Sequence, residues 1–303
     1  MQFTLSELTF IGTKYPTVSD LSFFTFVKKG LTGTEEKSLE EKGVFSNGQL
    51  TEPMNTVFDV LAHANQSARF VLKYQNNVME KGVYSFNDKR ILVENMQGEI
   101  VISFYDDEAK SVQQEIADHI GMSVQKNSAL DTILETDELL VALSLADWLR
   151  KQTLLNYIEV IEMPALTVEL FERYLLIPMK NSIAGLLAGL YEIKMPDHEQ
   201  KLKALNVLVE KKLIGIEGDA ISFSKEFSNF AMNFLLPDTQ IILETLDGSH
   251  EGPVVAASNV ILQAGLKDIV AFNATDEGIE MNTLTSSELL ARISAYLKCP
   301  KLK

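Results

Sequence analysis

The chain has a single cysteine, Cys299, among its 303 residues, so it cannot form an internal disulfide bond or a cysteine-based zinc site. Long hydrophobic runs are missing too, since Ser182–Tyr191, among the longest, falls well short of the roughly 18–20 residues of a membrane-spanning helix. The N-terminus shows neither a basic segment nor a long apolar segment, so we expect no signal peptide. These absences predict a cytoplasmic protein that does not insert into a membrane.

Positive charge is also scarce. The chain has 27 Lys and Arg against 42 Asp and Glu, a formal net charge of −15, and only five of its residues are arginine. Proteins that bind nucleic acid neutralise phosphates with clustered Lys and Arg, and no such cluster is visible here. The apolar fraction of 46% and the 8 prolines are enough for a folded core and exclude disorder as the main state.

Familiar catalytic motifs are absent. The sequence contains no GxSxG, no GxxxxGK[ST] and no GxGxxG, and its four histidines form neither HxH nor HExxH. The run Asp106-Asp107-Glu108 could form a cation site or a carboxylate pair, but acidic residues before a helix more often cap it. Asp197, beside His198, is likewise predicted to cap the helix that follows it. We therefore expect no catalytic residues, no metal, no cofactor and no enzyme activity.

The hydrophobic period changes along the chain. Helical spacing near the N-terminus gives way to four short runs rich in Val, Ile, Phe and Tyr, separated by turn residues; they are 69–74, 82–86, 90–95 and 99–105. This pattern predicts an antiparallel meander. A helix over about 107–120 should follow it, and a helical region over 130–162 should come next.

The second half of the sequence repeats the order of the first. Leu39–Phe45 resembles Leu208–Ile214, Phe70–Leu72 resembles Ile241–Leu243, and Gly82–Val83 resembles Gly252–Val254, at offsets of 169, 171 and 170 residues. We therefore predict an α+β fold with an internally duplicated, quasi-twofold architecture, in which a central, largely antiparallel sheet is flanked by helical bundles. The expected segments are a first repeat over 1–122, connecting helices over 123–162 and a second repeat over 163–303, in one compact unit.

The segment between the first two predicted strands is a candidate interaction site. It is longer than a tight turn requires and carries two apolar residues at a tip that should be exposed. Packing of the tip back onto the helices is an equally good interpretation. The candidate partner-binding residues are Gln75, Asn76, Asn77, Val78, Met79 and Glu80.

A second pattern favours a different function. Leu208–Ile214 followed by Gly218–Phe223 has the spacing of a helix and hairpin in a winged helix, which would place a basic recognition helix in the DNA major groove. The stretch mixes Lys201, Lys203 and Lys211 with Glu210, so it is only partly basic. A winged-helix transcriptional regulator is the alternative function.

The order of elements and several local strings resemble the EspG family, the cytosolic chaperones of type VII secretion. The strings that carry the resemblance lie within residues 4–121; they are Leu39–Val44, Gly48–Leu50, Val60–Ala62, Arg69–Leu72, Arg90–Val93 and Glu99–Ile102. The second half of the chain resembles the family more faintly, through the repeat.

The resemblance implies a quasi-twofold α+β fold and a non-enzymatic role, in which the protein binds a secreted helical hairpin in the cytosol and delivers it to the secretion machinery. In such proteins a loop between early strands and a helical bundle hold the tip of the substrate, which here singles out residues 75–80. The chain departs from the family in being rich in Lys, Asn and Ile and poor in Ala, Arg and Pro. This composition suggests a low-GC Gram-positive source and substrates of the WXG or LXG type. A homodimer is a further possibility.

Overall fold

The computed structural model describes residues 1–96, 98–105, 110–121, 123–126, 128–159, 165–175, 182–234, 238–250, 253–264 and 268–302. The chain divides into two compact units, and each of them is built from separate chain segments. Unit 1 comprises Met1–Gly121, Gln240–Val260 and Glu288–Lys303. Unit 2 comprises Met122–Thr239 and Ile261–Ser287.

The core of unit 1 is an antiparallel meander of four long strands. Along the chain they are β4 (Gln66–Tyr74), β5 (Asn77–Phe86), β6 (Lys89–Met96) and β7 (Glu99–Phe104). The hydrogen-bonded order in this unit is β1-β7-β6-β5-β4-β11, followed by the first residues of β12 (Val255–Ala264). Two further strands flank the meander: β1 (Gln2–Phe3) beside β7 and β11 (Thr239–Asp247) beside β4. The meander predicted from the sequence is confirmed.

Alternation along the strands gives this sheet two distinct faces. In β4 the side chains of Ala68, Phe70 and Leu72 are buried, and Arg69 between them is exposed. Residues directly opposite each other share a face, so Gly82, which pairs with Arg69, lies on the exposed side. We call the side that carries Arg69 and Gly82 face A and the opposite side face B.

Helices near the N-terminus cover part of face A. They are α1 (Leu5–Gly12), the short 3-10 turn η1 (Phe23–Thr25) and α3 (Glu52–His63), accompanied by α2 (Glu35–Glu41) and the small hairpin β2 (Phe45–Ser46) and β3 (Gln49–Leu50). Leu8 and Phe58 of these helices are fully buried in one cluster with Ile91 of β6 and Ile102 of β7. Thr4 and Glu7 form a capping box that fixes the start of α1.

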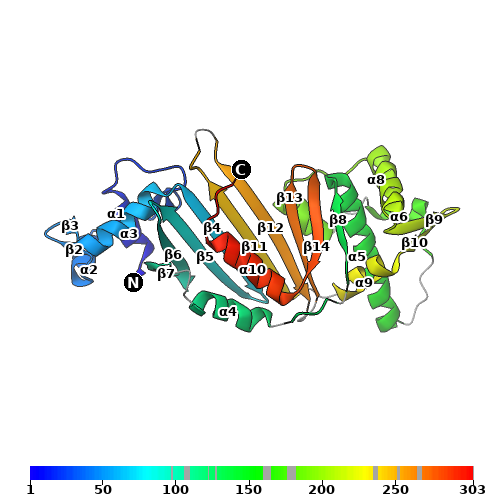
Figure 1. Ribbon diagram of the computed structural model, residues 1–303, viewed down its shortest axis with the longest axis horizontal. Helices are drawn as coiled ribbons and strands as arrows, with labels where there is room; N and C mark the ends of the chain where they lie inside the picture. Colours follow the sequence, from blue (N-terminus) through cyan, green and yellow to red (C-terminus); the bar gives the residue numbers. More distant parts are fainter. Residues whose placement is uncertain are drawn as a thin grey trace. The chain divides into compact units, whose positions relative to one another are not determined.

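Two other helices lie against face B of unit 1, α4 (Lys110–Ile120) and α10 (Ser286–Leu297) (Figure 1). Lys81 points to this side, is only 4% exposed, and pairs with Glu94 of β6 and, at 2.8 Å, with Glu115 of α4. Beyond α10, the thiol of Cys299 is buried and contacts the carbonyl oxygen of Val83 at 3.5 Å. The C-terminal segment is therefore part of the packing of unit 1.

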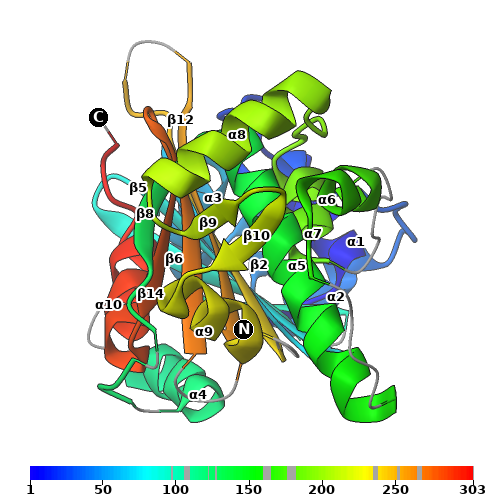
Figure 2. The same cartoon turned by 90° about the vertical axis from the view of Figure 1, so that its right-hand side faces the viewer.

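Unit 2 combines strands with a helical bundle (Figure 2). Its strands follow the order β12-β13-β14-β8, where β13 is Asp268–Thr275, β14 is Gly278–Leu284 and β8 is Asp131–Leu134. The long helix α5 (Thr136–Glu159) packs against the four other helices of the bundle: α6 (Val168–Leu175), α7 (Ile183–Leu190), α8 (His198–Glu210) and α9 (Lys225–Asn233). A hairpin of β9 (Ile214–Glu217) and β10 (Ala220–Phe223) follows α8.

The position of α5 in the bundle accounts for the nearly continuous apolar residues in its first half. Leu139 to Ala146 are buried on every side of the helix, because α7, α8 and α9 surround it together with β8 and β14. Asp147 is buried at the next turn, where Arg150 contacts it at 2.9 Å. Burial raises the pKa of Asp147, and the charge of Arg150 opposes that increase.

The fold class is α+β with a largely antiparallel sheet and flanking helices, as predicted from the sequence. Two local predictions were wrong. Residues 131–134 form strand β8, whereas the sequence favoured helix from residue 130. The sequence repeat paired Val83 with Val254. Val83 lies inside β5, whereas Val254 precedes β12, because the seven residues 248–254 separate β11 from β12. The acidic run Asp106-Asp107-Glu108 and Gly252 lie outside the described residues.

Candidate functional site

The hairpin between β4 and β5 ends in a turn of two residues. Tyr74 pairs with Asn77, so only Gln75 and Asn76 lie outside the strands. Gln75 has a φ of 52°, in the left-handed region that short turns use. The longer loop predicted over Gln75–Glu80 is therefore wrong in extent, since Asn77 to Glu80 belong to β5.

The strand geometry separates the six candidate residues. Gln75, Asn76 and Asn77 are exposed at the turn, and Val78 is 57% exposed opposite Lys73. Glu80 follows Val78 on face A by the two-residue period of a strand. Met79 points to face B and is half-buried opposite Leu72. Of the two apolar residues expected at the tip, only Val78 is an exposed side chain.

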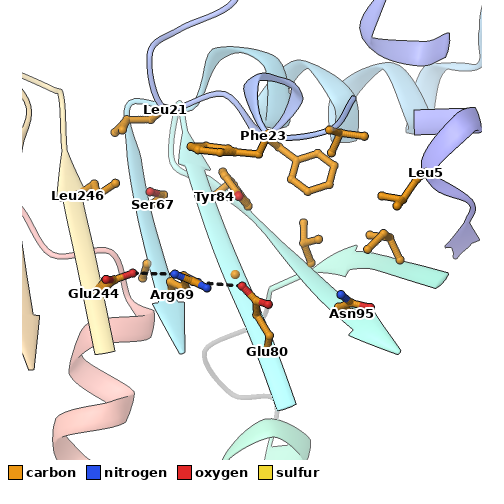
Figure 3. A pocket seen from close by; sticks show the side chains of 16 residues that line it. Leu5, Leu21, Phe23, Ser67, Arg69, Glu80, Tyr84, Asn95, Glu244 and Leu246 are labelled. Atoms are coloured by element: carbon orange, nitrogen blue, oxygen red, sulfur yellow. Dashed lines mark hydrogen bonds and ion pairs between the residues drawn. The ribbon is translucent and has the colours of Figure 1, made fainter. Parts of the chain in front are cut away.

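Face A of unit 1 contains a groove of about 560 Å³ (Figure 3). Its wall comes from the N-terminal segment and its floor from the strands. The wall residues are Leu5, Leu21, Phe23, Phe26 and Val27; the floor residues are Ser67, Ala68, Arg69, Glu80, Gly82, Tyr84, Val93, Asn95, Ile100, Glu244 and Leu246. We refer to this set as the groove. Its composition, apolar with a few polar groups, is typical of binding sites.

The aromatic residues of the groove have different exposures. Phe23 is buried and its ring meets that of Tyr84 edge-on at 5.6 Å. Phe26, three residues later, is 73% exposed. A large apolar side chain left open at the rim of an apolar cavity indicates a surface that binds another molecule.

A row of charged side chains crosses the floor over three strands. Arg69 of β4 donates from Nε to Oε1 of Glu80 at 2.8 Å and from Nη1 to Oε2 of Glu244 at 3.2 Å, as Figure 3 shows. Burial alone would lower the pKa of Arg69, but the hydrogen bonds and charges of Glu80 and Glu244 raise it. Arg69 therefore stays charged and fixed in place.

Tyr84 and Gly82 shape the floor beside this row. Burial, with the nearby charge of Glu80, raises the pKa of Tyr84 to about 12, so its hydroxyl group is neutral at physiological pH. A Cβ atom at residue 82 would lie 3.2 Å from Cε2 of Tyr84. Gly82 thus leaves space on the floor that a side chain would fill.

The side chains of the groove are suited to binding another molecule and do not form an evident catalytic arrangement. Its titratable groups are an arginine held by two carboxylates and a tyrosine with a raised pKa, and the lining contains no His or Cys. Within the described parts of the chain, no group of three or more His, Cys, Asp or Glu side chains could hold a metal ion.

The winged-helix pattern corresponds to α8 with the hairpin β9–β10. The local structure is as predicted, but Lys201 of α8 is buried, and the exposed side chains of that helix include Glu199, Lys203 and Glu210. Asp197 caps this helix, since its side chain accepts from the N–H of Gln200. A mixed surface of this kind has little attraction for phosphate.

The structure also has exposed apolar residues that sequence reasoning did not identify. Phe26 belongs to the run Phe23-Phe24-Thr25-Phe26, and a helical period cannot bury all three of these rings. The run could therefore have indicated from the sequence that one phenylalanine is exposed. No local sequence pattern could identify Glu244 as a groove residue, because its pairing with Arg69 joins residues 175 positions apart. In unit 2, the last turns of α5 expose Leu154, Leu155, Tyr157 and Ile158.

Comparison with solved structures gives a likeness over nearly the whole chain. The fold is similar to that of the Mycobacterium tuberculosis type VII secretion system chaperone EspG5, solved in complex with the PE25–PPE41 dimer, with a TM-score of 0.56 and 7% sequence identity. The match covers 99% of this chain and 94% of that chain. No protein-family model matches the sequence, and no curated protein matches it. The chain therefore has an EspG-like fold.

Among the described residues, no helix is both long enough and apolar enough to cross a bilayer.

Proposed function

We propose that this protein is a non-enzymatic chaperone that binds a secreted helical protein in the cytoplasm and delivers it to a type VII secretion system. The observation that carries the proposal is the likeness of fold to EspG5 over nearly the full length of both chains. The solved relative holds a PE25–PPE41 dimer. The groove of unit 1, with its exposed rim residue Phe26, supports a similar role here.

The substrate class we propose is a helical hairpin of the WXG or LXG type. We assign its contacts to the face A side of the β4–β5 hairpin together with the groove. Glu80 supplies the floor of the groove, Val78 supplies an apolar contact beside it toward the tip, and Gln75, Asn76 and Asn77 supply polar contacts at the turn. Met79 supports the hairpin from face B.

Co-expression with candidate substrates tests the proposal. Genes for small helical proteins beside a secretion ATPase gene supply the candidates, and the expected result is a stable complex on size-exclusion chromatography. Val78→Asp and Phe26→Asp should each weaken the complex at least tenfold, because a carboxylate replaces an exposed apolar contact. Val124→Asp, at a valine that is 81% exposed in unit 2 and outside the groove, is the matched control.

The proposal fails if none of the neighbouring helical proteins forms a complex. The same chromatography reports whether the free protein is a monomer or a homodimer.

We also propose that the fold is an internal duplication. The order α2, hairpin β2–β3, α3, strands β4 to β7 and α4 is repeated as α8, hairpin β9–β10, α9, strands β11 to β14 and α10. The segments are 1–122 and 163–303, joined by 123–162. In an experimental structure, residues 35–120 should superpose on residues 198–297 over all four strands; failure of any two strands to align would rule the duplication out.

The winged-helix regulator remains the second candidate because α8 and β9–β10 have the appropriate local structure. Salt-dependent retardation of duplex DNA at low ionic strength would support it over the chaperone.

A further inference from the structure

The charges on the floor of the groove do not balance. Arg69 contributes one positive charge, and Glu80 and Glu244 contribute two negative charges. Each carboxylate uses one oxygen atom for Arg69, which leaves the other oxygen able to accept from a ligand. An incoming anion would have to compete with two carboxylates for an arginine that is already paired. The centre of the floor therefore favours a cation.

The charges around the groove refine this pattern. Lys73 pairs across the strands with Val78, near the tip of the hairpin. Lys28 and Lys29 are exposed and directly follow the wall residue Val27. On the floor itself the negative charge thus lies in the middle, and a positive charge lies toward the tip of the hairpin, while the wall segment has Asp20 before it and Lys28 and Lys29 after it.

The dimensions of the surface suit a helix. From Tyr84 to Val78, face A of β5 extends over six residues, or about 20 Å, which is the length of about 13 helical residues. The backbone groups of β4 and β5 are already paired with neighbouring strands. An extended peptide lying on this face would leave its own N–H and C=O groups unpaired, whereas a helix satisfies them internally.

We infer that the groove binds an amphipathic helix of the partner protein, with its apolar side chains against Phe23 and Phe26 and a central Lys or Arg paired with Glu80 and Glu244. This assignment rests on the proposed function and specifies the helix that it recognises. Charge complementarity at the middle of the floor selects the basic residue, and the apolar wall supplies the remaining contact.

Three synthetic peptides test the assignment. Each is a 14-residue helical peptide with leucines three and four residues apart, and the central residue is Arg, Gln or Glu. Binding to the full-length protein is measured by fluorescence anisotropy. The expected order of affinity is Arg, then Gln, then Glu, with steps of about fivefold for a partly exposed ion pair.

Variants of the floor give effects of opposite sign. Glu80→Gln combined with Glu244→Gln should weaken binding of the Arg peptide about tenfold, because Arg69 is then unpaired and repels it. Arg69→Gln should strengthen binding several-fold by leaving both carboxylates free. Glu99→Gln, at an exposed glutamate of β7 outside the groove, should leave the affinity unchanged and corrects for general attraction to an acidic protein.

Several results would overturn the assignment. These are no binding of the Arg peptide, equal or tighter binding of the Glu peptide, an equal loss in Glu99→Gln and the double variant, or self-association of the protein through the groove. If a helical substrate is captured and the peptide experiment fails, the chaperone function stands without this recognition rule. If the peptides behave as expected and no secreted helical protein is captured, the proposed function is wrong and the groove assignment stands.

Discussion

Glu7 is a single residue that joins the start of α1 to α2 and its C-cap in unit 1. Its carboxylate accepts from the backbone N–H of Thr4 at 2.7 Å, from Nζ of Lys42 at 2.8 Å and from Oγ of Ser38 at 2.7 Å, and the residue is only 3% exposed. Burial alone would raise the pKa of Glu7, but these hydrogen bonds outweigh it and lower the pKa below its ordinary value of 4.5.

We expect Glu7→Gln to reduce the free energy of unfolding at neutral pH by about 1–3 kcal/mol, because the neutral amide cannot pair with Lys42 and adds a buried N–H₂ group. Since folding lowers the pKa of Glu7, its contribution is complete above the ordinary value of 4.5 and is lost as the pH falls through the lower folded-state value. Urea titrations at several pH values should therefore show the two proteins converging in acid.

Glu41→Gln is the matched control for this prediction, since Glu41 is 70% exposed in its pair with Lys37. We expect a change within about 0.5 kcal/mol for the control. A Glu7→Gln protein as stable as the control would show that the carboxylate charge contributes nothing.

Asp247 holds the C-terminal tail. Its carboxylate accepts from the N–H of Ser249 at 3.0 Å and from the N–H of Leu302 at 2.8 Å. Burial alone would raise the pKa of Asp247, but these hydrogen bonds, with the charge of His250, lower it to about 2. The attachment is therefore present above pH 3.8, the ordinary value, and is lost as the pH falls toward 2.

We expect Asp247→Ala to release the tail at neutral pH, with carboxypeptidase trimming the C-terminus several-fold faster than in the native protein. Asp276→Ala, at an exposed residue of unit 2, should trim at the native rate. Native-rate trimming of the Asp247 variant would mean that other contacts hold the tail.

At the level of secondary-structure elements, α4 depends on a buried lysine. Lys81 joins β5 to Glu94 of β6 and Glu115 of α4, and burial of this residue would be unfavourable without those partners. Burial alone would lower the pKa of Lys81, but the hydrogen bonds that its Nζ donates to Glu115 and Glu94 raise it, so the lysine is charged in the folded protein.

We expect Lys81→Met to loosen α4, with amide hydrogen exchange over 114–120 at least tenfold faster than in the native protein, because the helix loses its ion pair to the sheet. Lys89→Met, at an exposed lysine of β6, serves as the control. Unchanged exchange over α4 would show that its apolar residues alone, such as Ile116, fix it to face B.

Elements with a strong local pattern could be predicted from the sequence. Apolar and polar residues alternate along the strands of the meander, and turn residues separate these strands. Apolar residues in α3 and α8 follow a helical period, so the local sequence of each element predicts it. β8 could not be recognised, because Asp131–Leu134 is short and its place depends on pairing with β14. The tight turn at Gln75-Asn76 was missed because no glycine marks it.

The groove was less predictable than the strands beneath it. Sequence reasoning identified the hairpin tip with Val78 and Glu80, but the wall residue Phe26 and the floor residue Glu244 come from opposite ends of the sequence. Their juxtaposition depends on the order β5-β4-β11 in the sheet, which local patterns do not encode.

At the level of the whole molecule, unit 1 is discontinuous in sequence. Residues 1–121 need β11 beside β4 and α10 from the C-terminal segment to complete the unit. We expect residues 1–121 expressed alone to be insoluble or to bind a hydrophobic dye strongly, because the nine-residue edge of β4 and the apolar side chains of face B lose their cover.

Circular dichroism and thermal unfolding of this fragment, with the full chain as control, check the expectation. A soluble fragment with a cooperative transition would show that the first segment folds without the other two.

The same discontinuity bears on how the protein is made. A ribosome that has released residue 121 must still add the remaining residues up to 303 before the last segment of unit 1 exists. At about 5–20 residues per second, that interval lasts roughly 10 seconds or more. During the first part of it, until β11 has been made, the edge of β4 stays open on the nascent chain. Holdase capture or pausing during translation should therefore affect the yield of this protein more than that of a protein whose first domain is contiguous.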